Sequence, residues 1–225
     1  MRIMLAGPSG IGKTTLANQV STLLDKQFIS GSVSDLLPKT KDIPHSDMLD
    51  RDSQELYRED YQILNLRKKV FEGMVDFVSD RSFVDSATYF LYKQASKIPA
   101  CEVEHFINLC GRLTTSLCDL LVVLELSTDD IHTWITEDNG KRIVSNYFQT
   151  LITYNMRMVL KLMGYKKCTT YNTIPVGKFL SYKVLDQYFE VGNIKNVYGE
   201  TKVVIIKDLN LTNRIDILKY ICQKK

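Results

Sequence analysis

The sequence predicts a single three-layer α/β domain, in which a five-stranded parallel sheet is flanked by helices on both faces. Short apolar, β-branched runs alternate with longer amphipathic stretches, which is typical of a parallel sheet covered by helices. A glycine-rich segment at residues 7–12 separates the first such run from the first amphipathic stretch. The length of 225 residues suits one domain better than two. We therefore expect one active site, beyond the carboxyl ends of the strands, where open α/β sheets bind ligands.

In the first half of the chain, the apolar spacing predicts three strands and two helices. The longer helix has Ser53 as its expected N-cap and Gly73 as its stop. Residues 34–52 are polar and carry two prolines, so we interpret them as a connection that borders a ligand. The expected elements are strands Arg2–Ala6, Phe28–Val33 and Met74–Ser79 and helices Thr14–Asp25 and Ser53–Glu72.

The second half continues the alternation as far as Gly164, which should end a helix. A polar loop at about 136–146 is expected to act like a lid, and residues 165–200 match no element that we can place. The domain core is therefore expected at about 1–165 together with 201–225. The expected elements are helices 85–96, 103–117, 147–163 and 214–222 and strands 120–126 and 201–207.

The composition fits an ordinary soluble, cytoplasmic protein. Hydrophobic residues make up 44% and charged residues 24% of the chain, which argues against a disordered or fibrous protein. The five cysteines form no C-x-x-C pair, so neither a zinc site nor a disulfide framework is indicated. The chain runs from Met1 directly into a motif at Gly7, which leaves no room for a signal sequence. No apolar run approaches the roughly 20 residues that a membrane span needs, so we expect no membrane partner.

The net charge of +3 is unevenly distributed. Residues 161–225 hold 12 Lys and Arg against 5 Asp and Glu, a balance of +7, whereas residues 1–160 have a balance of −4. A basic C-terminal part could contact a polyanion such as nucleic acid. The alternative is a set of solvated surface lysines.

The segment from Gly7 to Thr14 fits the pattern G-x-x-x-x-G-K-[ST] at every required position, and it lies where a predicted strand passes into a helix. Glycines let backbone N–H groups wrap around phosphate oxygens at a positive helix N-terminus. Lys13 should reach the β- and γ-phosphates of ATP, and the Thr14 hydroxyl should coordinate Mg²⁺. The alternative is a glycine-rich turn without a ligand. The motif therefore predicts a P-loop NTPase sandwich that binds ATP through Gly7, Pro8, Ser9, Gly10, Ile11, Gly12, Lys13, Thr14 and Thr15.

The P-loop does not decide what happens to the γ-phosphate, because kinases, motor ATPases, GTPases and switches share it. The acceptor side is indicated by Asp80-Arg81-Ser82 at a strand end, followed by Ala87 and Tyr89. This segment resembles thymidylate kinases, which carry Asp-Arg-Tyr, a small polar residue and Ala-Tyr there, and deoxynucleoside kinases, which carry acid-Arg-Ser.

The resemblance implies that Asp80 polarises the acceptor oxygen or holds the magnesium shell, and that Arg81 steadies a transferred or acceptor phosphate. A guanidinium can bind phosphate bidentately, which suits the second role. The alternative is a surface ion pair of Asp80 and Arg81. Asp85 could equally be a helix cap, and Tyr89 a core aromatic.

A second resemblance comes from Asp138-Asn139-Gly140-Lys141-Arg142, which is similar to the Asp-Gly-x-Arg loop of nicotinamide riboside kinase-like P-loop domains, with one extra residue. It implies that Arg142 is a catalytic lid arginine, which would stabilise charge on the transferring phosphoryl group. A simple exposed turn is the alternative.

The chain departs from thymidylate kinases after the second strand, where Ser30-Gly31-Ser32-Val33-Ser34-Asp35 stands in place of their acid-Pro-Gly element. Base and sugar contacts are expected from residues near the acceptor. Tyr57 and Tyr61, at i and i+4, could instead pack along one helix face. The candidate substrate-binding residues are Asp35, Asp50, Arg51, Tyr57, Arg58, Tyr61, Gln62, Phe83, Asp85 and Tyr89.

The leading functional hypothesis is an ATP-dependent kinase that phosphorylates a nucleoside or a deoxynucleoside monophosphate, with a homodimer as a possible assembly. A second hypothesis is a viral kinase that phosphorylates a hydroxymethyl-pyrimidine within DNA, motivated by the basic C-terminal part and the missing acid-Pro-Gly element. A third is an ATP-driven switch protein without a small-molecule acceptor.

Overall fold

The computed structural model describes residues 1–37, 52–126, 146–168, 189–207 and 211–223. One seven-stranded sheet, in the order β2-β3-β1-β4-β7-β6-β5, forms the centre of the molecule. Its strands are β1 (Arg2–Ala6), β2 (Gln27–Ile29), β3 (Phe77–Ser79), β4 (Leu120–Leu124), β5 (Tyr165–Lys167), β6 (Phe189–Asn196) and β7 (Gly199–Ile206). Its helices are α1 (Lys13–Leu23), α2 (Val33–Leu36), α4 (Ser53–Glu72), α5 (Phe83–Gln94), α6 (Ala100–Leu117), α7 (Asn146–Leu162) and α9 (Leu211–Gln223).

The sheet has a parallel part and an antiparallel extension. Strands β2, β3, β1, β4 and β7 pair in parallel, while β6 runs antiparallel to β7 and β5 antiparallel to β6. The predicted fold class is therefore confirmed, but the predicted five-stranded sheet lacked two strands. Both missing strands come from residues 165–200, which the sequence pattern left unassigned. Gly192 and Asn193 interrupt the apolar alternation of β6, which weakens its strand signal.

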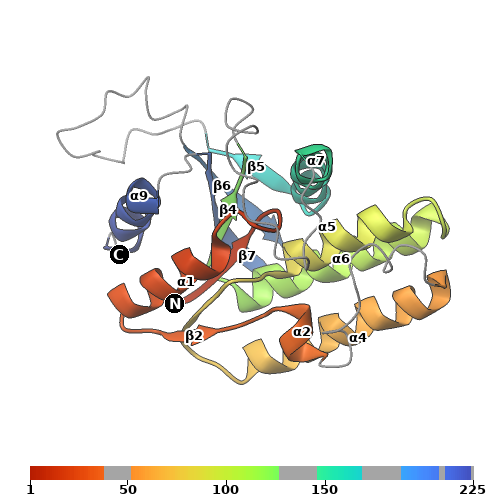
Figure 1. The fold of residues 1–225 in the computed structure, drawn as a ribbon, viewed down its shortest axis with the longest axis horizontal. Helices are drawn as coiled ribbons and strands as arrows, with labels where there is room; N and C mark the ends of the chain where they lie inside the picture. The colour runs from red at the N-terminus through yellow and green to blue at the C-terminus, as the bar shows by residue number, and fades with distance from the viewer. Residues whose placement is uncertain (38–51, 127–145, 169–188, 208–210, 224–225) are drawn as a thin grey trace.

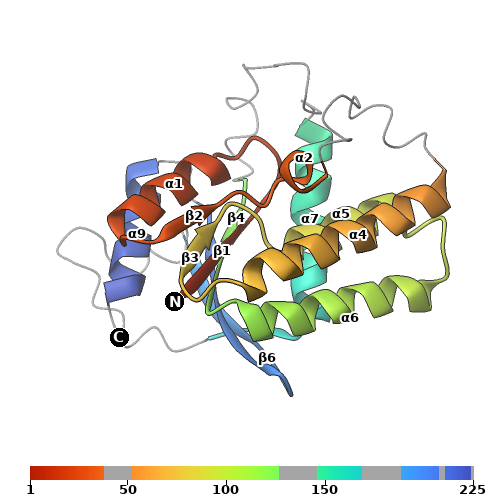
Figure 2. The ribbon, with the colours of Figure 1, turned by 90° about the horizontal axis from the view of Figure 1, so that it is seen from below.

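Helices cover both faces of the sheet, as predicted. Helices α1 and α9 lie on one side, and α4, α5, α6 and α7 lie on the other (Figures 1 and 2). Successive residues of a strand point to opposite faces. In β1, Met4 and Ala6 join the core under α4–α7, whereas Ile3 and Leu5 join the core under α1 and α9. This double burial explains why the parallel strands read as continuous apolar runs.

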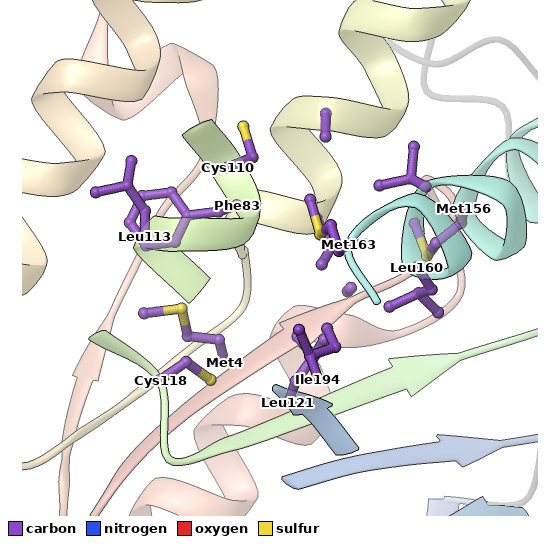
Figure 3. Close-up of a cluster of buried hydrophobic side chains, with 14 of the residues drawn as sticks. Met4, Phe83, Cys110, Leu113, Cys118, Leu121, Met156, Leu160, Met163 and Ile194 are labelled. Atoms are coloured by element: carbon purple, nitrogen blue, oxygen red, sulfur yellow. The ribbon is translucent and has the colours of Figure 1, made fainter. Parts of the chain in front are cut away.

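The larger core lies under α4–α7, and Figure 3 shows part of it. Met4 and Leu121 from the sheet meet Leu113 from α6 and Met163 from the end of α7 there. Aromatic stacking reinforces the helix layer, since the rings of Phe90 and Phe106 lie 3.9 Å apart. Burial raises the pKa of the Cys118 thiol in this core to about 12, so it stays protonated and unreactive.

The predicted helices match the structure closely, whereas three predicted strands are too long, including the strand 120–126, which ends at Leu124. Helix α4 has the predicted bounds, but its N-cap is Asp52 and not Ser53. The Asp52 carboxylate accepts hydrogen bonds from the backbone N–H groups of Gln54 and Glu55. Strand β2 ends at Ile29, because Val33–Leu36 forms the short helix α2, and β3 begins only at Phe77. No helix in the described part of the chain is long and apolar enough to cross a membrane.

An ion-pair network joins the antiparallel extension to the parallel part. Arg157 on α7 binds Glu125, just after β4, at 2.8 Å, and Glu190 on β6 at 3.1 Å. The Tyr165 hydroxyl on β5 donates to the same Glu190 at 2.6 Å. Burial alone would raise the pKa of Glu190, but Tyr165, Arg157 and Lys167 hold it below its ordinary value. The network therefore stabilises the ionised form of Glu190.

Candidate active site

The phosphate loop, residues 7–14, connects β1 to α1, as predicted. A Cβ on Gly7, at φ 152°, would lie 2.8 Å from the Leu124 carbonyl oxygen of β4. Gly12 caps α1 in the left-handed region at φ 84°, where a side chain is strained. Both glycines are therefore required by the path of the backbone. The sheet places this loop beside the carboxyl ends of β3 and β4.

Lys13 is almost fully buried, and its ammonium folds back onto the loop. It donates to the carbonyl oxygens of Gly7 at 2.6 Å and Pro8 at 2.7 Å. These short contacts hold a positive charge over the loop. An anionic ligand that reaches the loop would meet this charge together with the N-terminus of α1.

Asp80 joins the loop, as the sequence predicted for a residue at the end of β3. The Thr14 hydroxyl donates to Asp80 Oδ2 at 2.6 Å, and the Gly31 N–H donates to Asp80 Oδ1 at 3.0 Å. Only 3% of Asp80 is exposed, so these two bonds fix its orientation. A threonine hydroxyl beside a carboxylate provides the hard oxygen ligands that Mg²⁺ prefers, and the donor set therefore fits this ion.

Asp85 caps its own helix and also binds the phosphate loop. Its Oδ2 accepts from the Ser82 N–H at 2.9 Å and from the Ser82 hydroxyl at 2.8 Å, which closes a capping box at the start of α5. Its Oδ1 accepts from the Gly7 N–H at 3.3 Å and lies 3.8 Å from an Arg81 nitrogen. The helix-cap interpretation is therefore realised, and one carboxylate ties α5, Arg81 and the loop together.

Arg81, just before α5, interacts with Tyr89 on α5 through a side-chain hydrogen bond. Burial alone would lower the pKa of Arg81, but Asp85, Tyr89 and Asp80 raise it above its ordinary value. Burial raises the pKa of Tyr89, although Arg81 and a backbone hydrogen bond from Ser9 of the loop oppose this shift. Arg81 therefore keeps its charge, and 26% of its side chain remains accessible to a ligand.

Arg67 belongs to this site, although the sequence interpretation missed it. From α4 it donates to the carbonyl oxygens of Ser82 at 3.0 Å and Gly31 at 2.7 Å, and it also binds the Ser86 hydroxyl. Burial lowers the pKa of Arg67 to about 10, so it stays charged at neutral pH. A signal was present in the sequence, because Arg67 occupies the apolar stripe of α4 between Ile63 and Phe71.

Other predicted substrate residues lie elsewhere. The Tyr57 hydroxyl donates to Glu102 on α6, and its ring packs against Tyr61, so the helix-face alternative holds for this pair. Phe83 is fully buried in the core against Phe71 and does not face a ligand, which corrects its assignment as a substrate contact.

Among the polar candidates, Asp35 accepts a hydrogen bond from Ser30 at 2.5 Å. Arg58 and Gln62 are exposed on α4, while Asp50, Arg51, Asp138 and Arg142 lie outside the described residues.

The comparisons with known proteins agree with this fold. Residues 3–72, which are 70 of the 225 residues, match the ATPase family associated with various cellular activities (AAA). No curated protein matches the sequence. A deoxyadenosine kinase from M. mycoides with bound dCTP is similar in structure, with a TM-score of 0.61 and 13% identity over 100% of both chains. The thymidylate kinase of Candida albicans has a TM-score of 0.56 and 12% identity, covering 99% of this chain and 90% of its own.

At these identities the likeness establishes a shared fold. The chain therefore has the α/β fold of the P-loop kinases, as the phosphate-loop motif predicted.

Proposed function

We propose that the protein is an ATP-dependent kinase that transfers the γ-phosphoryl group to a nucleoside or a deoxynucleoside monophosphate. The observation that carries this proposal is the 2.6 Å hydrogen bond between the Thr14 hydroxyl and Asp80. It brings the end of the phosphate loop together with the strand end where the acceptor motif lies. This contact supports the proposal because it joins the phosphate loop to the segment that resembles an acceptor motif, where Arg81 also lies.

The residues divide into donor and acceptor roles. The loop amides and Lys13 bind the ATP phosphates, and Thr14 and Asp80 would hold Mg²⁺, which neutralises charge on the β- and γ-phosphates when bound. Both carboxylate oxygens of Asp80 already accept hydrogen bonds, which favours a metal-holding role over proton abstraction. Arg81 is charged and accessible, so it can bind the transferred or acceptor phosphate.

In the proposed reaction, an acceptor oxygen attacks the γ-phosphorus as the bond to the bridging oxygen of ADP breaks. A hydroxyl acceptor loses its proton to water, whereas a monophosphate acceptor attacks with an oxygen that carries no proton. Two proteins with a similar fold support this acceptor class, because one is a deoxyadenosine kinase and the other a thymidylate kinase.

Transfer of label from γ-labelled ATP to a panel of nucleosides and deoxynucleoside monophosphates tests the proposal. We expect at least one acceptor to be phosphorylated, and Asp80→Asn to abolish transfer while ATP still binds. Asp76→Asn is the matched control, because Asp76 pairs with Lys26 and the N-terminus near the start of β3. An unlabelled panel, or full activity of Asp80→Asn, would contradict the proposal.

The two other hypotheses become outcomes of the same experiment. Label transferred to DNA that contains hydroxymethyl-pyrimidines, with steeply salt-dependent DNA binding, would support the viral DNA-modification reading. ATP hydrolysis without any labelled acceptor would support a switch protein. A homodimer remains a prediction that sedimentation velocity can test.

A further inference from the structure

The last helix of the described chain contacts the phosphate loop through a buried arginine. Helix α9 packs beside α1, in the core on the side of the sheet opposite α4–α7 (Figure 1). From this helix Arg214, only 1% exposed, donates through Nη1 to the Ile11 carbonyl oxygen at 2.7 Å. The two residues are 203 positions apart in the sequence, so no local pattern connects them.

This hydrogen bond selects the orientation of one peptide group in the loop. The Ile11 carbonyl and the Gly12 N–H belong to the same planar trans peptide, so they point in opposite directions. Because Arg214 holds the Ile11 oxygen toward α9, the Gly12 N–H points away from α9. A phosphate loop binds anions with its N–H groups, and the Gly12 N–H can take part only when the Ile11 carbonyl is turned away from the anion.

The same side chain places a positive charge close to the loop. Its Nη1 lies 3.6 Å from the position that a Cβ on Gly12 would occupy. An arginine guanidinium is charged throughout the physiological pH range, and burial weakens the screening of its charge. Arg214 therefore adds to the field that Lys13 and the α1 N-terminus present to an anion.

We propose that Arg214 is a positioning residue for the ATP phosphates: it turns the Gly12 N–H into the phosphate cradle and supports it with a fixed charge from behind. This inference rests on the proposed function, because it assumes that the loop binds a nucleotide. Arg214 does not touch the ligand itself and acts through the Ile11–Gly12 peptide.

The variants Arg214→Met and Arg214→Lys test this role in the full chain, with ADP and inorganic tripolyphosphate as probes. Methionine keeps much of the side-chain volume but removes the charge and the donor. We expect at least a tenfold weaker affinity of Arg214→Met for both probes, and a smaller loss for lysine, which keeps the charge. The Gly12 amide resonance should shift when tripolyphosphate binds to the wild type, and this shift should be reduced in Arg214→Met.

Leu218→Ala is the matched control on the same helix. Leu218 is buried in the core shared with α1, so its truncation loosens the packing of α9 and keeps the guanidinium. Its melting temperature should fall while its affinity for tripolyphosphate stays within threefold of the wild type. A role limited to stability would instead make affinity follow the melting temperature in both variants.

The outcomes separate the two proposals. If the wild type binds neither probe, the proposed function fails. If the wild type binds both, but Arg214→Met binds them equally well with an unchanged Gly12 shift, only the role of Arg214 fails. If Arg214→Met does not fold, an Arg214→Lys variant with wild-type affinity and a wild-type Gly12 shift overturns the role, and a weakened one supports it.

Discussion

The phosphate loop and the acceptor side are built in different ways, although they meet at one edge of the sheet. The bonds of Lys13 in the loop reach back only five and six residues, to Pro8 and Gly7. On the acceptor side, Arg67 reaches carbonyl groups 15 and 36 residues away, and Asp85 binds Gly7 across 78 residues. The loop therefore owes its path to its own glycines and Lys13, with Asp85 and Arg214 holding single peptide groups from outside. The acceptor side depends instead on buried charged side chains that tertiary packing brings together.

Removal of Arg67 tests most directly whether the acceptor side depends on buried charged side chains, and it should have the largest effect on stability. Arg67→Ala leaves the buried carbonyl groups of Gly31 and Ser82 without this donor, and we expect the free energy of unfolding to fall by about 3–5 kcal/mol. Urea unfolding would measure the loss. Arg58→Ala, on the exposed face of the same helix, should change stability by less than about 0.5 kcal/mol. Equal losses in both variants would show that Arg67 does not organise the acceptor side.

Lys13→Ala tests the opposite case, in which a loop residue matters for chemistry more than for the fold. Removal of a preorganised charge should lower kcat/KM for phosphoryl transfer roughly 10²–10³-fold, which is a loss of about 2.7–4 kcal/mol of transition-state stabilisation. Stability should fall by less than in Arg67→Ala, because Lys13→Ala leaves two carbonyl groups without this donor, whereas Arg67→Ala leaves two carbonyl groups and a hydroxyl. The control Lys26→Ala removes a lysine that pairs with Asp76 just after α1 and should leave kcat/KM unchanged. A loss of stability as large as that of Arg67→Ala would contradict the distinction.

Gly31 tests how tightly the acceptor side is packed. A Cβ at this position would lie 2.7 Å from the Cβ of Arg81, so Gly31→Ala must displace Arg81 or the chain after β2. We expect a loss of about 1–3 kcal/mol in stability, as for other overpacked sites, and a larger drop in transfer than in ATP affinity. Gly73→Ala is the control, since its nearest contacts would be at 3.7 Å. Unchanged acceptor kinetics in Gly31→Ala would mean that this contact does not position Arg81.

The ion-pair network around Glu190 lies outside both the phosphate loop and the acceptor side, so it serves as a reference for the two regions. Of the variants considered, those of Glu190 should have the smallest effect. The pKa of Glu190 is lower in the folded protein than its ordinary value of 4.5. Its stabilising effect is therefore present above about pH 4.5 and is lost as the pH falls through the folded-state pKa. Glu190→Gln should show a weaker fall in melting temperature below pH 4.5 than the wild type, whereas the exposed Glu200→Gln should follow the wild type. ATP affinity at pH 7 should be unchanged in both variants.

Much of the fold could be predicted from local patterns. The buried strands β1, β4 and β7 read as apolar runs. Both ends of α4 could be predicted to the residue, because helical spacing and a stop signal coincide there. Strands β5 and β6 could not be predicted, since a three-residue edge strand and the glycine-containing strand beside it leave little periodicity. Within the candidate site, the position of Asp80 beside the phosphate loop could be predicted, because the carboxyl ends of neighbouring parallel strands meet at one edge of the sheet. Phe83 was misassigned because an aromatic residue beside a motif looks the same whether it is buried in the core or faces a ligand.

The sequence alone determined where the phosphate loop lies, since glycine, lysine and threonine at fixed spacing between a strand and a helix favour a turn that presents N–H groups to an anion. Only the tertiary structure decided which side chains surround that loop. Arg67, Asp85 and Arg214 come from three helices, and each forms a hydrogen bond to a backbone group 36 or more residues away. Such bonds form only when the sheet has brought those segments together, so no local sequence pattern can predict them.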